Sequence, residues 1–308
     1  MKDQHNIHVL VTCGGGLQGL TLYKWLSQIE SLVSHLFDIH EENIGRYFYD
    51  HFFQSSPVRS EQQYERELYD YCRGHGIGLI VPATQYDLLF LSRRKKIFEE
   101  QLQCHIAVPE EPWVQTLINK KAAKSFLISN GFPVEEERDP SNAGHYPIMG
   151  KPMRGWGGKG AVVLKDPADF LAYRNKVDDY LWTAYVEGFK EYSIDFAVNH
   201  QGKISSLMSR ERKLVAGGFT WISQSARLPN NYKALIEKAF SKASLSGIYN
   251  LQYISLSSGD MFTDLNPRIG TSALGWGTYN PICHFLDLHS YNEVMPDEWK
   301  VIRYLEEK

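Results

Sequence analysis

The first hundred residues alternate short apolar runs with helical patterns, and this alternation constrains the fold more than any other feature. β-Branched and aliphatic residues dominate the runs at residues 7–12, 34–39 and 78–82, which predict strands. Helical periodicity separates these runs, over residues 17–29 and 61–73. Strands joined through helices pair in parallel, because the crossover connection returns the chain to the end of the sheet where the previous strand began. The segment therefore predicts an open parallel sheet of the α/β class.

The pattern changes beyond Pro112. A helix is predicted over residues 114–129, ended by Asn130 and Gly131 with Pro133 beyond it. Further strands are expected over residues 146–150, 160–164, 181–186, 191–198 and 203–210, further helices over 169–176 and 230–244, and a hairpin over 247–256 and 260–265. At 308 residues the chain is long enough for two or three packed subdomains.

Composition and charge narrow the classes of function. The net charge is -3 and the pI is near 6.4, so neither nucleic acid nor an anionic membrane is expected as a partner. The four cysteines are widely separated without a C-x-x-C pair, which argues against a zinc cluster or a disulfide framework. The first six residues do not look like a signal peptide, and no apolar run approaches the ~20 residues that cross a bilayer. We therefore expect a cytoplasmic protein.

A glycine-rich turn at residues 14–16 follows the first predicted strand and opens the first predicted helix. Backbone amides in such a turn can face an anion at the helix N-terminus. Up to Gly19 the turn gives only a loose version of G-x-G-x-x-G, and Asp38 alone stands where an acidic residue would complete a dinucleotide site. A tight turn bordering a substrate cleft is favoured, and a nicotinamide-dependent oxidoreductase stays as an alternative.

A second glycine-rich loop joins two predicted strands and carries lysines. Lys151 belongs to the first strand, and the loop contains Gly155, Gly157, Gly158, Lys159 and Gly160. Glycines let backbone amides approach phosphate oxygens, and lysines add point charges that suit polyphosphate. The G-K-[ST] ending of a Walker A loop is missing. The loop predicts a polyphosphate site, with a flexible hairpin tip bearing surface lysines as the alternative.

A carboxylate, two amides and an arginine form the third constellation. Residues i and i+2 of a strand point to one side, so Asp264 and Asn266 share a face, which Gln252 joins if it lies on the partner strand. Their oxygens, with phosphate oxygens supplying the rest, suit a magnesium ion. Arg268 would then stabilise charge on a transferring phosphoryl group. A turn capped by Asn266 before Pro267 is the alternative.

In combination and in this order, these features resemble the ATP-grasp superfamily, especially ligases similar to the large subunit of carbamoyl phosphate synthetase. The resemblance spans roughly residues 7–290. It implies an ATP-grasp fold, in which two α+β subdomains grip ATP, preceded by an open parallel-sheet, Rossmann-like domain. The implied division is 1–110 for the preceding domain, 111–184 for the central subdomain with its flap, and 185–308 for the C-terminal subdomain with the metal and catalytic residues.

The resemblance also assigns nucleotide-binding positions. Lys120 and Lys151 match lysines that contact phosphates, and the loop from Gly155 to Gly160 matches a mobile flap that closes over them. The segment with Tyr185, Val186 and Glu191 looks like the hinge, where the main chain near Val186 would bond adenine and Glu191 would accept from the ribose hydroxyls.

Metal and catalytic positions follow from the same resemblance. Gln252, Asp264 and Asn266 fall where the family places its metal ligands, and Arg268 where it places a catalytic arginine. Three departures stand out: Ala184 and Asp264 occupy positions where glutamate is usual, and Gln252 replaces the acidic ligand of many relatives.

The sequence therefore predicts a ligase that uses ATP with Mg²⁺, or with Mn²⁺ in its place. A small carboxylate would be activated as an acyl phosphate and passed to an amine, with release of ADP and phosphate. Lys151, Arg268 and Arg210 are the candidates for catalysis; Arg210 and Arg212 would bind the carboxylate or acyl phosphate, or else are surface strand residues. An ATP-binding regulatory module without turnover is the alternative, and a homodimer through the N-terminal sheet is plausible.

Overall fold

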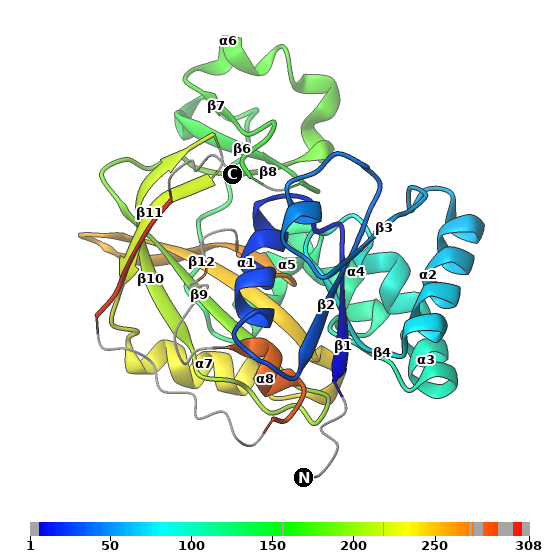
Figure 1. The fold of residues 1–308 in the computed structure, drawn as a ribbon. Helices are drawn as coiled ribbons and strands as arrows, with labels where there is room; N and C mark the ends of the chain where they lie inside the picture. The colour runs from blue at the N-terminus through cyan, green and yellow to red at the C-terminus, as the bar shows by residue number, and fades with distance from the viewer. Residues whose placement is uncertain are drawn as a thin grey trace.

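The computed structural model describes residues 6–155, 157–217, 219–270, 273, 280–288 and 298–303. Three sheets with five, six and three strands organise these residues (Figure 1). Within them, no helix combines the length and the apolar character that a membrane span requires.

The five-stranded sheet is parallel throughout and has the strand order β3-β2-β1-β4-β5, which confirms the predicted parallel sheet. Its strands are β1 (Ile7–Thr12), β2 (Leu32–Asp38), β3 (His51–Gln54), β4 (Ile77–Pro82) and β5 (His105–Ile106), with the short 3-10 helix η1 (Gly45–Tyr47) before β3. The accompanying helices are α1 (Leu17–Leu26), α2 (Glu61–His75) and α3 (Leu88–Leu102). Helix α2 buries Tyr64, Leu68, Tyr71 and Cys72, whose 4-3-1 spacing places them on one helical face.

The six-stranded sheet is antiparallel and has the order β13-β12-β9-β10-β11-β14. Its strands are β9 (Lys190–Val198), β10 (Met208–Ala216), β11 (Phe219–Ser225), β12 (Gly247–Leu256), β13 (Gly259–Asn266) and β14 (Lys300–Ile302). Three helical segments accompany it: α7 (Asn230–Phe240), the 3-10 helix η4 (Ala243–Leu245) and α8 (Pro281–Phe285).

Strict alternation gives this sheet two different faces. Ile194 and Phe196 of β9 are buried among aromatic and aliphatic residues of α5 and α7. Ser193 and Asp195, one residue out of phase, are cross-strand partners of Gln252 and Asn250 on the other face. That second face is polar over its centre, and it forms the site described below.

The three-stranded antiparallel sheet lies beyond the others, at the top of Figure 1. It contains β6 (Ile148–Pro152), β7 (Val162–Leu164) and β8 (Tyr180–Ala184). The helical segments before and within it are α4 (Glu111–Leu117), α5 (Lys120–Ser129), η2 (Ala143–His145), α6 (Pro167–Phe170) and η3 (Arg174–Asp179). Ile148, Leu164 and Trp182 form a small separate core between its strands.

One hydrophobic core joins the parallel sheet to the six-stranded sheet. Leu22 and Trp25 of α1 are 0% exposed and belong to the same cluster as Ala197, Met208 and Ile248. Packing of this density fixes the orientation of α1. The N-terminal end of α1 is thereby held beside the polar face of the larger sheet.

Three predicted helices are wrong in extent. The helix expected over 230–244 ends at Phe240 and is followed by η4. The helix expected over 114–129 is divided into α4 and α5, because Asn119 is extended and its side-chain oxygen caps α5 by accepting from Ala122 N at 3.0 Å. The helix expected over 169–176 is instead the short α6 followed by the 3-10 helix η3. Asp166 starts α6 early by accepting from the backbone of Ala168 and Asp169.

Two predicted strands also differ. The strand expected over 203–210 begins only at Met208, because the Asn199 side chain accepts from the backbone of Gln201 and Lys203 and holds a turn there. The strand expected over 160–164 begins at residue 162, since Gly160 has φ +76. Strands β3, β5, β11 and β14 were not predicted.

Candidate active site

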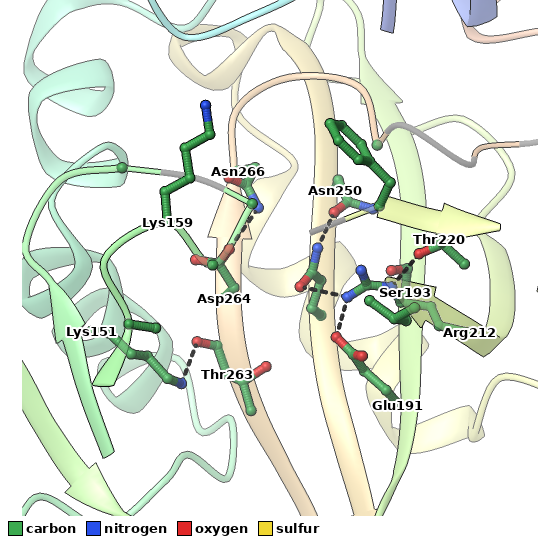
Figure 2. A pocket seen from close by; sticks show the side chains of 18 of the residues that line it. Lys151, Lys159, Glu191, Ser193, Arg212, Thr220, Asn250, Thr263, Asp264 and Asn266 are labelled. Carbon is green, nitrogen blue, oxygen red and sulfur yellow. Dashed lines mark hydrogen bonds and ion pairs between the residues drawn. The ribbon is translucent and has the colours of Figure 1, made fainter. Parts of the chain in front are cut away.

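A cavity of about 300 Å³ lies between the glycine-rich loop and the polar face of the six-stranded sheet (Figure 2). The N-terminal region contributes Gln18 from the start of α1. The predicted site residues that line the cavity are Lys120, Lys151, Gly155, Gly157, Gly158, Lys159, Glu191, Arg210, Gln252, Asp264, Asn266 and Arg268. Three predicted residues, Gly160, Tyr185 and Val186, are not among its lining, and Tyr185 instead donates to Glu187 at 3.1 Å.

The glycine-rich loop forms one wall through a backbone that only glycine adopts readily. Gly155, Gly157, Gly158 and Gly160 have φ values of 140°, 65°, 69° and 76°. Three of the four also lie on the cavity surface. These three glycines therefore present backbone without side chains to the cavity.

Two lysines of this wall are held by carboxylates. The Nζ of Lys120, in the first turn of α5, lies 2.8 Å from Oδ1 of Asp264. The Nζ of Lys151 lies 2.7 and 2.5 Å from the two oxygens of Glu135, and 3.4 Å from the Thr263 carbonyl. These side chains are largely buried, so the pairs are weakly screened by solvent.

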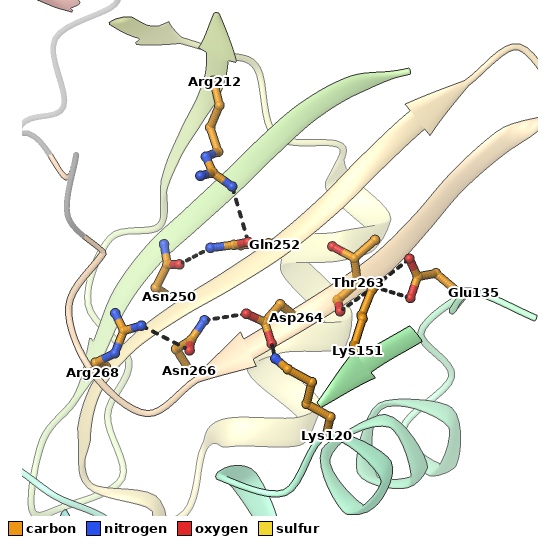
Figure 3. A network of polar contacts seen from close by, with 10 residues as sticks. All are labelled: Lys120, Glu135, Lys151, Arg212, Asn250, Gln252, Thr263, Asp264, Asn266 and Arg268. Atoms are coloured by element: carbon orange, nitrogen blue, oxygen red, sulfur yellow. Dashed lines mark hydrogen bonds and ion pairs between the residues drawn. The ribbon is translucent and has the colours of Figure 1, made fainter. Parts of the chain in front are cut away.

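The opposite wall brings the predicted carboxylate and amides together. In the register of β12 and β13, Gln252 is paired with Asp264 and Asn250 with Asn266 (Figure 3). Asn266 Nδ2 donates to Asp264 Oδ2 at 3.0 Å. The expected geometry, with all three predicted ligands on one face, is confirmed.

Each of the three predicted ligands offers an oxygen that accepts from a cation. Oδ1 of Asp264 accepts from Lys120 as described, Oε1 of Gln252 accepts from Arg212 at 3.3 Å, and Oδ1 of Asn266 accepts from Arg268 at 3.3 Å. Burial acts to raise the pKa of Asp264, but Lys120, Asn266 and Lys151 outweigh it and hold that pKa below its usual value. Asp264 is thus an ionised carboxylate at neutral pH.

The arginines occupy three different environments. Arg210 is almost fully buried and its Nε lies 2.7 Å from Oδ2 of Asp195. Arg268 is 7% exposed, and burial lowers its pKa against the opposing effect of Asp264. Arg268 donates to the Ile269 carbonyl at 2.8 Å, while its buried Nε has no hydrogen-bond partner in the described part of the chain.

The carboxylate of Glu191 is already paired with a side chain in this structure. It forms an ion pair with Arg212, whose Nε also donates to Thr220 Oγ1 at 2.7 Å (Figure 2). Burial lowers the pKa of Arg212, and Glu191 opposes that shift. A ribose hydroxyl would therefore compete with a guanidinium for this carboxylate.

Four residues of the site carried no role in the sequence analysis: Glu135, Asp195, Asn250 and Gln18. Asn250 had a signal, since it precedes Gln252 by two residues in a predicted strand. Glu135 and Asp195 are partners of cations that lie 16 and 15 residues away, and nothing in their local sequence marks them.

The first glycine-rich turn is closed by a carboxylate. Gly15 N donates to Asp38 Oδ2 at 2.9 Å, and Asp38 Oδ1 accepts from His40 N at 3.0 Å. A Cβ on Gly19 would lie 1.7 Å from the Gly14 carbonyl oxygen, so the turn packs tightly on α1. An anionic group already faces the amide that a pyrophosphate would need, which favours the tight-turn interpretation over a dinucleotide site.

The side-chain oxygens of Gln252, Asp264 and Asn266 fit a magnesium ion whose remaining ligands are phosphate oxygens. Among the described residues, no three His, Cys, Asp or Glu side chains are grouped so that they would hold a metal ion. Asp264 is the one carboxylate among the three predicted ligands, beside the two amides. Magnesium accepts such oxygens when substrate phosphates complete its shell.

Comparisons with known proteins agree with this arrangement at the level of fold. No protein-family model matches the sequence, and no curated protein matches it. Biotin carboxylase from Campylobacter jejuni, solved with β,γ-ATP, has a TM-score of 0.69 at 12% identity, covering 96% of this chain and 73% of that one.

Two further solved structures are similar. The biotin carboxylase domain of Hydrogenobacter thermophilus 2-oxoglutarate carboxylase, solved with MgADP, ADP and bicarbonate, has a TM-score of 0.67 at 15% identity, over 86% of this chain and 64% of that one. Staphylococcus aureus N5-carboxyaminoimidazole synthetase has a TM-score of 0.64 at 16% identity, over 86% and 71%. The chain covers just under two thirds of the length of the Hydrogenobacter thermophilus domain. It has the ATP-grasp fold that these carboxylases and synthetases share.

Proposed function

We propose that the protein is an ATP- and Mg²⁺-dependent ligase that activates a carboxylate as an acyl phosphate and joins it to an amine. One observation carries the proposal: lysines and a glycine-rich loop line the same cavity as carboxylate, amide and arginine side chains. Among these side chains are those of Asp264, Gln252, Asn266, Arg210 and Arg268. A similar fold has been solved with MgADP and with bicarbonate, a small carboxylate-like anion.

The chain's own residues divide the work. Lys120, Lys151 and Lys159 neutralise phosphate oxygens, together with the glycine amides of the loop. Gln252, Asp264 and Asn266 would hold a magnesium ion, which would neutralise negative charge on the phosphates. We assign the adenine and ribose to the side of Tyr185, Val186 and Glu191, where binding requires Arg212 to release Glu191.

Arg268 and Arg210 bind and orient the anionic substrate. A carboxylate oxygen attacks the γ-phosphorus, the bond to ADP breaks, and the acyl phosphate forms. The amine nitrogen then attacks the acyl carbon, phosphate leaves, and the nitrogen loses a proton. No protein nucleophile is needed, so the rate gain comes from positioning and from stabilising charge.

We further propose the predicted division into a preceding, Rossmann-like domain over 1–110, a central subdomain over 111–184 and a C-terminal subdomain over 185–308. The parallel sheet ends at Ile106, the three-stranded sheet at Ala184, and the six-stranded sheet begins at Lys190. Each division falls between sheets.

A second function, ATP binding without turnover, is favoured by one observation. Lys151 is neutralised by both oxygens of Glu135, and Lys120 by Asp264, so two phosphate-binding charges are already compensated. A protein that only binds ATP as a signal does not need uncompensated positive charge near the γ-phosphate.

The test is release of ADP from ATP with Mg²⁺, across a panel of amino acids, amino sugars and small diacids, singly and in pairs. A ligase releases ADP only when its carboxylate is present, and forms product only when the amine is added. Magnesium-dependent ATP binding without ADP release across the panel supports the sensor, and no ATP binding at all refutes both.

A further inference from the structure

A buried chain of hydrogen bonds crosses the polar face of the six-stranded sheet and ends at Gln252. Asn250 is directly opposite Asp195, and its Nδ2 donates to Asp195 Oδ1 at 2.7 Å. Gln252 Nε2 then donates to Asn250 Oδ1 at 2.8 Å (Figure 3). Asp195, Asn250 and Arg210 are each 1% exposed, so water does not replace these partners.

The backbone at Gly270 packs directly on this chain. A Cβ there would lie 2.6 Å from Asn250 Nδ2 and 2.8 Å from Asp195 Oδ1. A glycine at this position therefore keeps the contact between Asp195 and Asn250 enclosed.

The donor-to-acceptor direction of these hydrogen bonds follows from Asp195, the first residue in the series. A carboxylate paired with a guanidinium acts as an acceptor, and both oxygens of Asp195 accept here: Oδ2 from Arg210 Nε and Oδ1 from Asn250 Nδ2, each at 2.7 Å. Asn250 must then turn its amino group to Asp195 and its carbonyl oxygen to Gln252. Gln252 must donate to that oxygen, so its own Oε1 points the other way, toward Arg212 and the cavity.

We propose that Asp195 is a positioning residue that sets, through Asn250, the direction of the Gln252 amide, so that an oxygen and not an amino group faces the cavity. The consequence for metal binding rests on the proposed function, whereas the direction of the amides does not. The experiments below separate the two.

The first experiment measures the coupling between positions 250 and 252 in the protein without ligands. Gln252→Glu is made with Asn250 and with Asn250→Ala, and urea unfolding is followed at pH 8. The ionised carboxylate introduced at position 252 meets the Asn250 carbonyl, so the midpoint should fall further with Asn250 than with alanine. An equal or smaller fall with Asn250 overturns the proposed direction. Gln252→Met in both backgrounds is the uncharged control.

The second experiment tests the control by Asp195. In Asp195→Asn, the Nε of Arg210 claims the amide oxygen, so the new amino group faces Asn250 and turns it around. Asn250 then offers a donor to residue 252. Gln252→Glu should therefore lower the unfolding midpoint less with Asn250 than with Asn250→Ala, the reverse of the order expected in the first experiment. An unchanged order in the folded variant overturns the role of Asp195, because a purely structural role would not change the sign.

If Asp195→Asn does not fold, a double variant takes its place in the test. Asp195→Asn combined with Arg210→Met removes the buried charge with its partner. Without a fixed acceptor or donor at position 195, the difference between the backgrounds with Asn250 and with Asn250→Ala should shrink toward zero. Persistence of the full difference overturns the proposal.

The link to function is read from ADP affinity by calorimetry, with and without Mg²⁺. Asp195→Asn should lose roughly 10- to 100-fold of the magnesium-dependent affinity, as for other residues that orient metal ligands, and leave metal-free binding little changed. An undiminished magnesium effect overturns this link. If the unmutated protein shows no magnesium effect, the proposed function fails while the unfolding results still decide the amide direction.

Discussion

Replacing Asp264 with asparagine is expected to change ADP binding in opposite directions with and without magnesium. In the free protein Asp264 holds Lys120 at 2.8 Å, with the two side chains 24% and 16% exposed. A phosphate that takes over Lys120 must first break this contact. The substitution keeps the shape of the side chain and an acceptor oxygen, but removes the charge.

The magnitude follows from that contact. Hydrogen bonds to charged groups contribute about 1.5–3 kcal/mol, and a neutral acceptor retains part of this. Asp264→Asn should therefore return roughly 1–2 kcal/mol to metal-free binding, which tightens ADP by about 5- to 30-fold. With Mg²⁺ the variant lacks the one carboxylate of the predicted ligand set, so the gain that magnesium gives the unmutated protein should disappear.

Isothermal titration with ADP, with EDTA or with Mg²⁺, measures both effects. Asp260→Asn is the matched control, because it is the same change on the same strand, at a carboxylate that accepts from Tyr232 at 2.9 Å outside the main cavity. Weaker metal-free binding by Asp264→Asn would refute the reasoning, as would a magnesium effect of undiminished size.

Three other expectations concern stability and phosphate binding. Burial and neighbouring imidazoles lower the pKa of His35 to about 3, so only the unfolded chain takes up this proton between pH 6.5 and 3. Stability should drop by about 2 kcal/mol from this residue between pH 7 and 5, and His35→Leu should flatten the urea-unfolding pH profile by that amount. Arg210→Met leaves Asp195 as a buried charge without its guanidinium and should cost about 3–5 kcal/mol in urea unfolding; Asp195→Leu in addition should restore most of it. Glu135→Gln frees the charge of Lys151 and should tighten metal-free ATP about tenfold, ~1.4 kcal/mol, by calorimetry; unchanged affinity would contradict the role of Lys151.

The shared face of the three proposed metal ligands was predictable because it depends on a short-range rule. Gln252, Asp264 and Asn266 lie in a hairpin whose two strands are close in sequence, and the two-residue period places them on one face. The parallel sheet was predictable for a similar reason, since the alternation of strands and helices leaves few topologies.

The partners of the cations were not predictable from one sequence. Lys120 and Asp264 are 144 residues apart, and their contact exists only because α5 packs beside β13. The start of β10 was misplaced because the Asn199 side chain holds a turn by local hydrogen bonds, which outweigh the strand propensity of the residues that follow. Lys120 itself was assigned only through the resemblance.

The strands that carry the site also carry stacked aromatic side chains on their opposite face. Tyr192 and Tyr253 stack at 4.9 Å between ring centroids, one residue away from Glu191 and Gln252 on their own strands. A substitution on that opposite face would not touch a ligand in the cavity, yet it would shift the backbone that carries the proposed ligating side chains. Inactive variants are therefore expected from the sheltered aromatic side of these strands as well as from the cavity, and such variants would report on precision of placement instead of chemistry.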